Sequence, residues 1–237
     1  MKKGIIAVLV LTLAVGIGFF TQGIEAGGHV YQDGTFMGYS DATDRGYMDA
    51  EVTIENGSIV EVVIRGYGNL GTEKPETYPW DEYHEALEVL PELYVERDHW
   101  DVDIVTGATG SSNQANQAVY RALARARVEP TNQKNEFFDG TFMAISDKTE
   151  RGWVIVWVTF ANDKITDFRL VETQSDNDSW QRKGDDYPWD EYHELLEVLP
   201  EQIIEAQSLD VDGLSGATGT FNRALQAAER AMDKARR

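Results

Sequence analysis

The chain has 237 residues, 42% of them hydrophobic, and a formal net charge of −20 at pH 7. This length and apolar content are enough for one ordinary core or two small ones, while so large a negative charge argues against nucleic acid as a partner. The sequence contains no cysteine, which excludes disulfides, thiolate metal sites, iron–sulfur clusters and cysteine nucleophiles. Any redox chemistry would therefore depend on a bound cofactor.

The N-terminal segment has the pattern of an export signal. Lys2 and Lys3 precede an apolar run over residues 4–20, and a more polar stretch ends at Ala26. We expect residues 1–27 to be a signal peptide cleaved after Ala26, or a membrane anchor, because the run is near the lower length limit of a spanning helix. A buried N-terminal helix is the alternative, disfavoured because the run is apolar on every side.

In either preferred case the rest of the chain is exported. We expect it at the cell surface, in the periplasm or on the outer face of the cytoplasmic membrane. If the segment stays uncleaved, the membrane itself becomes a partner.

An internal repeat divides the remainder of the sequence. Residues 33–37 recur at 139–143, an offset of 106, and residues 78–91 recur at 187–200 with 13 of 14 positions identical. A repeat of this length is a whole domain and not a solenoid unit. We therefore expect a first domain over residues 30–128, a polar linker over 129–136 and a second domain over 137–236.

A β-hairpin is expected near the start of each copy. Residues 50–54 alternate between apolar and polar, Asn56 and Gly57 are a turn signal, and residues 59–64 return as the second strand. The second copy repeats this pattern with strands over 154–160 and 165–171.

Two helices are expected after each hairpin. The first begins near Trp80 or Trp189 and should be interrupted at Pro91 or Pro200, because proline cannot donate the helical hydrogen bond. The last helix follows a Gly-Ala-Thr-Gly segment, where apolar residues recur at helical spacing. The expected fold class is α+β, with two tandem copies of a small domain in which helices back an antiparallel sheet, preceded by an N-terminal signal or anchor helix.

The most specific signal lies where that last helix begins, in both copies. Small residues allow a bulky group to approach the backbone, and the free N–H groups of a helix start favour a phosphate. A hydroxyl there could also be an ordinary N-cap, but its repetition together with an upstream Asp favours a binding role. The candidate residues are Asp103, Thr106, Gly107, Ala108, Thr109, Gly110 and Ser111 in the first copy, and Asp212, Ser215, Gly216, Ala217, Thr218, Gly219 and Thr220 in the second.

These segments have the form Asp-x-x-Ser/Thr-Gly-Ala-Thr-x-Ser/Thr, and with them both copies resemble the FMN-binding domain of the flavin-bearing subunits of the Rnf and Nqr respiratory complexes and of extracellular electron-transfer flavoproteins. The resemblance extends over residues 32–235. It implies that a flavin transferase, using FAD and magnesium, attaches FMN through a phosphoester bond to the final hydroxyl of the motif.

Carried over to this sequence, the resemblance makes Ser111 and Thr220 the acceptors, so up to two covalent FMN groups are expected. Asp103 and Asp212 would be the motif acids. The second copy fits the pattern more closely, since Ser111 stands where threonine is usual.

The function implied by the resemblance is that of an exported electron carrier, not an enzyme, which exchanges electrons with donor and acceptor proteins. A flavin-free ligand-binding or structural module of the cell surface is the alternative, against which the hydroxyl kept in both copies argues. A reductase has no support, because no nicotinamide-binding fingerprint follows a strand.

The repeated aromatic segment within residues 78–91 and 187–200 allows two interpretations. Its rings would either pack the helix on the sheet, which we prefer, or stack on a flavin. His84 and His193 have no close histidine partner, so we expect surface or capping roles for them and no metal site.

Overall fold

The computed structural model describes residues 30–128, 134–177 and 179–237. The expected signal or anchor segment, residues 1–27, lies outside these ranges, as does most of the expected linker. Within the described part of the chain, no helix is long and apolar enough to cross a membrane.

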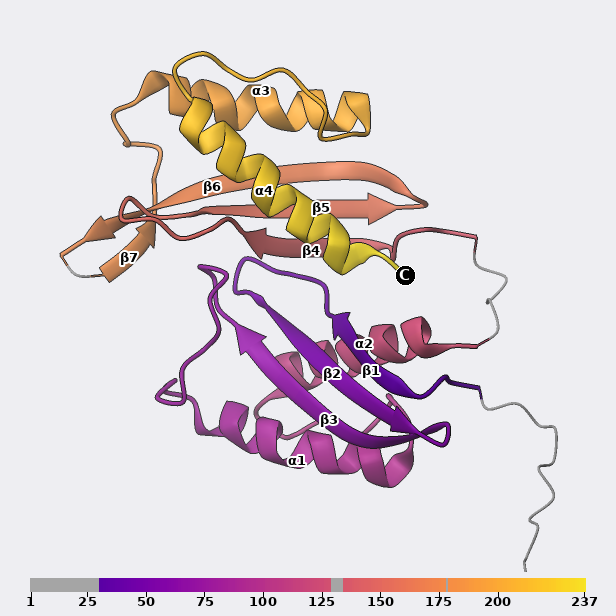
Figure 1. Cartoon of the computed structure of the whole chain (residues 1–237). Coiled ribbons are helices and arrows are strands. Elements are labelled where there is room, and N and C mark those ends of the chain that lie inside the picture. The colour runs from indigo at the N-terminus through magenta and orange to yellow at the C-terminus, as the bar shows by residue number, and fades with distance from the viewer. Residues whose placement is uncertain (1–29, 129–133, 178) are drawn as a thin grey trace, which may run out of the picture.

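Each half of the chain is an antiparallel sheet with two helices, which confirms the α+β prediction (Figure 1). Strand order follows chain order in both sheets. The elements of the first half are β1 (Gly34–Tyr39), β2 (Tyr47–Glu55), β3 (Ser58–Tyr67), α1 (Asp81–Arg97) and α2 (Thr109–Ala126). Those of the second half are β4 (Gly140–Ile145), β5 (Val154–Ala161), β6 (Lys164–Asp176), β7 (Ser179–Arg182), α3 (Asp190–Ala206) and α4 (Thr218–Ala235).

The helices cover one face of each sheet in the same way. In the first half α2 packs on β1 and β2 while α1 packs on β3, and α4 and α3 take the corresponding places in the second half. Each half thereby buries its own apolar core between its helices and its sheet.

Both expected hairpins are present. Asn56 and Gly57 have φ of 52° and 77° at the β2–β3 turn, and Asn162 and Asp163 have φ of 52° and 61° at the β5–β6 turn. Positive φ at both central residues gives the type I′ turn that suits the twist of a hairpin. The sequence did not indicate β7, a four-residue polar strand that pairs with the end of β6.

The expected interruption at Pro91 and Pro200 is wrong, because α1 and α3 run through these prolines without a break. An internal proline removes one hydrogen bond and costs about 3 kcal/mol. The apolar face of α1 continues past Pro91, with Leu90 and Tyr94 fully buried on the sheet. This packing on both sides of the proline holds the helix together.

The second sheet is covered on both faces. The side chains of Ile155 and Trp157 on β5 point away from α4 and are buried in a cluster that includes Ala42 and Tyr47 of the first half. As a result, the second sheet lies between its own helices and the first half (Figure 1). A backbone hydrogen bond also joins the two halves, in which the N–H of Ala42 donates to the carbonyl of Thr141 at 2.7 Å.

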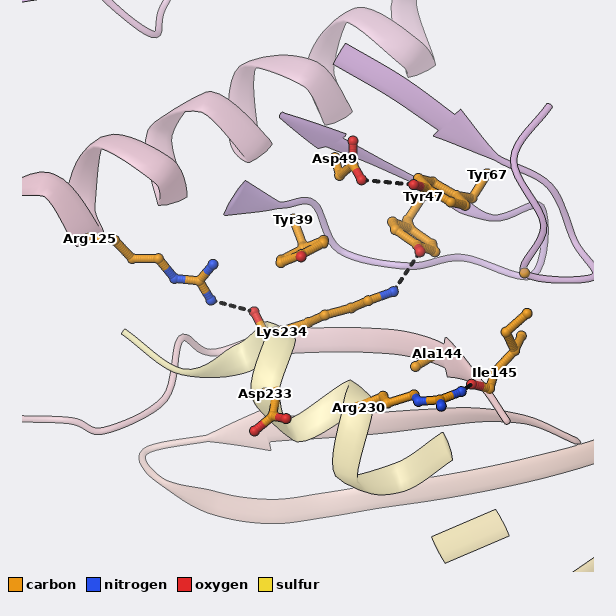
Figure 2. A pocket seen from close by; sticks show the side chains of 11 residues that line it. Tyr39, Tyr47, Asp49, Tyr67, Arg125, Ala144, Ile145, Arg230, Asp233 and Lys234 are labelled. Carbon is orange, nitrogen blue, oxygen red and sulfur yellow. Dashed lines mark hydrogen bonds between the residues drawn. The ribbon is translucent and has the colours of Figure 1, made fainter. Parts of the chain in front are cut away.

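A lysine from the last helix joins the two halves. Lys234 Nζ donates to the hydroxyl of Tyr47 at 2.5 Å (Figure 2). It also donates to the carbonyl of Met143 at 2.9 Å. Tyr47 in turn stacks on Tyr67, with ring centroids 4.5 Å apart. Burial lowers the pKa of Lys234 to about 8, even though Asp49 nearby favours the charged form. The side chain lines a cavity of about 490 Å³ between the halves.

We expect this partly buried lysine to make stability depend on pH. The pKa of Lys234 is about 8 in the folded state and 10.5 as the ordinary value of a lysine. Between pH 8 and pH 10.5 the unfolded state therefore binds more protons, and the free energy of unfolding rises with pH. Relative to Lys234→Met, the free energy of unfolding of the unsubstituted protein should increase by about 1–2 kcal/mol between pH 7 and pH 9.5. Urea unfolding at both pH values measures the difference. The variant Lys164→Met, at the exposed start of β6, is the control, and an equal response of all three proteins would contradict the assignment.

Candidate functional site

The motif of the first copy forms a tight turn that leads into α2. Gly107 has φ of 85°, a conformation that residues with a side chain rarely adopt. The N–H of Ala108 donates to the carbonyl of Val105 at 3.0 Å, and Ala108 itself is fully buried. Gly216 and Ala217 repeat this geometry before α4, with φ of 88° at Gly216. The small residues of the motif are therefore required by the turn.

Two adjacent serines follow this turn, and they differ in their contacts. Ser112 Oγ donates to the carbonyl of Ala108 at 3.0 Å and accepts from the N–H of Val105 at 3.1 Å, so it fastens the turn. Among the described residues, the Ser111 hydroxyl has no such partner and lines a cavity. Helix α2 has no side-chain hydrogen bond at its N-cap, so the capping role considered for the motif hydroxyl is not present at Ser111.

The cavity at Ser111 has a volume of about 510 Å³. Three parts of the first half form it: the β1–β2 turn, the chain that leaves β3, and the first turn of α2. Its lining residues are Thr43, Arg45, Gly46, Tyr67, Lys74, Tyr78, Trp80, Gly110, Ser111 and Gln114. A hydroxyl, two cationic side chains and three aromatic rings thus meet in one space.

Lys74 is the charged group of most interest in this cavity. Its Nζ lies 4.4 Å from the ring centroid of Tyr78 and 4.3 Å from that of Tyr83. Within the described part of the chain, no carboxylate forms an ion pair with it, and burial lowers its pKa. A half-buried ammonium group without a counter-ion favours the binding of an anion beside it.

The aromatic residues of the repeated segment divide into core residues, as we preferred, and residues that line the cavity, for which stacking on a flavin stays a prediction. Tyr83 is 2% exposed and packs in the core, where burial raises its pKa to about 12. Tyr78 and Trp80 line the cavity. The ring of His84 forms a 2.7 Å hydrogen bond with the carbonyl of Tyr78, and His193 forms the same bond with Tyr187. The histidines therefore fasten the loop that carries the aromatic residues.

The candidate motif residues fall into three groups in each copy. Only Gly110 and Ser111 line the cavity of the first copy. The side chain of Asp103 is 88% exposed and pairs with Arg97 at 3.5 Å, and Asp212 is exposed as well. The remaining candidates shape the turn or face solvent: Thr106, Gly107, Ala108 and Thr109, and Ser215, Gly216, Ala217, Thr218 and Gly219.

The second copy differs at the acceptor hydroxyl. Thr220 is 1% exposed, and its Oγ1 donates to Oε2 of Glu172 at 3.0 Å. The same carboxylate is paired with Lys183, at 2.6 Å, and with Arg223. Removing one partner from such a buried pair costs about 3–5 kcal/mol. The hydroxyl of the second motif is therefore part of a closed ionic network.

The sequence analysis did not identify most of the charged groups in the two sites. Lys74 and Lys183 occupy equivalent loop positions at the repeat offset of 109, and this recurrence was a signal that could have identified them. Glu172 has no equivalent carboxylate in the first copy, where Gly66 occupies its place in the sheet register. In the described residues, no group of three or more histidine, aspartate or glutamate side chains could hold a metal ion.

The fold consists of two small, similar α+β domains in tandem, and the first has a cavity at its motif hydroxyl. The family model described as FMN-binding domain matches residues 45–124 and 151–233. The chain therefore belongs to the FMN-binding domain family and carries the domain twice, which confirms the family resemblance of the sequence.

The chain is also similar to part of a much longer protein. The NADH:acrylate oxidoreductase of Vibrio harveyi is 26% identical over an alignment of 196 residues, and the match covers 79% of this chain and 17% of that protein. This chain thus spans less than a fifth of the length of that relative. A solved structure of the CPE2226 protein from Clostridium perfringens matches with a TM-score of 0.36 and 23% identity, covering 42% of this chain and 88% of the other.

Two glycines of the motif should respond oppositely to substitution. We expect Gly107→Ala to destabilise the protein by about 1–2 kcal/mol, because alanine is strained at positive φ and its Cβ would lie 2.7 Å from Cγ of Glu82. Gly110→Ala adds a Cβ with nothing within 4 Å and should stabilise the first turn of α2 by up to about 1 kcal/mol. Thermal unfolding of both variants tests this, and equal effects would contradict the described turn.

Proposed function

We propose that this protein is an exported electron-transfer flavoprotein that holds FMN covalently through a motif hydroxyl, for which Ser111 and Thr220 are the two candidates, so that a chain carries at most two FMN groups. Membership in the FMN-binding domain family supports the cofactor. The observation that carries the proposal is the cavity at Ser111, where an unpartnered hydroxyl lies in the same space as a lysine without a counter-ion.

The residues of this cavity fit the phosphate of FMN. Ser111 lies in the first turn of α2, where backbone N–H groups without helical partners favour an anion. Lys74 and Arg45 supply positive charge in the same cavity. A phosphate attached to Ser111 would thus be balanced by these two cations.

Aromatic walls suit the flavin ring as well. Tyr67, Tyr78 and Trp80 line the cavity and offer ring faces on which a planar group can stack. Bound FMN would supply the one- and two-electron chemistry, and the domain would position it and keep its ring accessible.

Attachment through a phosphoester is a balanced group transfer. The hydroxyl oxygen attacks the phosphorus on the flavin side of FAD, and a new P–O bond forms. The bond from that phosphorus to the bridging oxygen breaks, AMP leaves, and the hydroxyl proton is released. A separate flavin transferase with magnesium would carry out this reaction, and the exposed acids Asp103 and Asp212 are available for it to recognise.

The location and the carrier role form part of the proposal. An export segment at residues 1–27 supports a place outside the cytoplasm, where a covalent bond prevents loss of the cofactor by dilution. The similarity to part of an oxidoreductase supports flavin-associated electron transfer. We propose that donor and acceptor proteins exchange electrons with the bound flavin and that the chain has no substrate of its own.

Intact-mass analysis of protein produced together with a flavin transferase tests this function. We expect a mass increase of FMN less one water for each attached group, retained after denaturation. The double variant Ser111→Ala, Thr220→Ala should lose every increment, because no motif hydroxyl remains.

Ser112→Ala is the matched control, since Ser112 is adjacent but fastens the turn. It should lower stability by about 1 kcal/mol and keep the added mass. Protein of unmodified mass, made with a transferase that is active on another substrate, would contradict the proposed function.

A further inference from the structure

We propose that Glu172 is a built-in anion that occupies the phosphate position of the second domain, so that Ser111 accepts FMN and Thr220 does not while Glu172 is in place. This inference rests on the proposed function. It also runs against the motif alone, in which the threonine of the second copy fits the family pattern more closely.

The contacts of Glu172 are those expected of a bound phosphate. Its carboxylate accepts from the motif hydroxyl of Thr220 at 3.0 Å and from Lys183 at 2.6 Å, and it is paired with Arg223. Glu172 is 2% exposed, so the site is occupied from within the protein. An attached phosphate would require the same partners and would bring further negative charge beside a buried carboxylate.

Backbone contacts establish that the two sites correspond. The N–H of Lys74 donates to the carbonyl of Gly66 at 2.8 Å, and the N–H of Lys183 donates to the carbonyl of Glu172, also at 2.8 Å. Both lysines lie over the equivalent tyrosines, Lys74 over Tyr78 and Lys183 over Tyr187. The two sites therefore share a lysine and a first-turn hydroxyl, and they differ in the carboxylate.

Packing in the first domain explains why glycine, and not glutamate, stands at position 66. A Cβ added to Gly66 would lie 2.5 Å from the hydroxyl of Tyr83 and 3.0 Å from the sulfur of Met48, so the first domain has no room for a side chain there. In the second domain the smaller Val154 replaces Met48 opposite this position in the sheet register. The tyrosine at this position is shared, since Tyr192 accepts from the N–H of Glu172 at 3.2 Å, so the two domains differ here at the strand pair of Met48 and Gly66 against Val154 and Glu172.

A carboxylate beside a hydroxyl can also act as a general base, which would give Glu172 the opposite role of activating Thr220. Lys183 already donates to Oε2 of Glu172, the same oxygen that accepts from Thr220, and Arg223 pairs with Oε1, so two cations already engage this carboxylate. It also lies in the space that an attached phosphate would need. We therefore favour the blocking role, and the experiment below separates the two.

The test compares site occupancy after production with a flavin transferase, by intact mass and by mapping of the modified peptide. The unsubstituted protein should carry one FMN, at Ser111. Ser111→Ala should lose at least nine-tenths of the added mass. The triple variant Ser111→Ala, Val154→Met, Glu172→Gly places the residues of the first site at the second. It should regain the added mass of one FMN group. A further Thr220→Ala should remove that mass again.

Two further variants keep the result interpretable. Arg223→Gln introduces the residue that the first domain has at this position, Gln114, and leaves the bonds from Glu172 to Thr220 and Lys183 in place, so the second site should stay closed. Glu172→Gln removes the charge and keeps the side-chain volume, and it should allow partial loading of Thr220 in the Ser111→Ala background.

The outcomes are distinct. Full loading of Thr220 in Ser111→Ala would overturn the inference and leave the proposed function standing. Loading of Thr220 that depends on Glu172 would make the glutamate an activating base and would likewise overturn it. Unmodified mass for the unsubstituted protein and every variant would overturn the proposed function together with this inference.

Discussion

In both halves of the protein a partly buried lysine lies against aromatic rings beside a hydroxyl in the first turn of a helix. Such an ammonium group is stabilised by a nearby anion, and the two halves differ in how that anion is supplied. In the second domain Glu172 supplies the charge to Lys183 and closes the site. In the first domain the glycine at the same position leaves Lys74 with a cavity of about 510 Å³. The lysine thus has a carboxylate partner within the protein in the second domain, and it is open to an anionic ligand in the first.

The two copies also differ on the sheet faces that point away from their helices, and the contact between the two halves forms there. At the positions of Ile155 and Trp157 the first copy has Asp49 and Glu51, so at these positions the outer face of the second sheet is apolar and that of the first is charged. Tyr67 lines the cavity at Ser111 and stacks on Tyr47, whose hydroxyl receives a hydrogen bond from Lys234 of the second domain. The second domain therefore supports one wall of the site in the first (Figure 2).

Much of the fold followed from the sequence, because repeats, hairpin turns and helical periodicity are local signals. Proline failed as a helix signal, since packing of α1 outweighs one lost hydrogen bond. The motif identified Ser111 but not its cavity, because Tyr67 at the end of β3 and Lys74 in the following loop are distant from the motif in the sequence. Glu172 could not be recognised as a partner of Thr220 across 48 positions, since only the strand register brings them together.

The central claim is that the hydroxyl of Ser111 holds FMN with its phosphate beside Lys74. A crystal structure of the protein produced with a flavin transferase tests it most directly. We expect electron density for a phosphate joined to Ser111 Oγ, within hydrogen-bond distance of Lys74 Nζ, with Glu172 still bonded to Thr220. A flavin joined to Thr220 with Glu172 displaced, and Ser111 free, would contradict it.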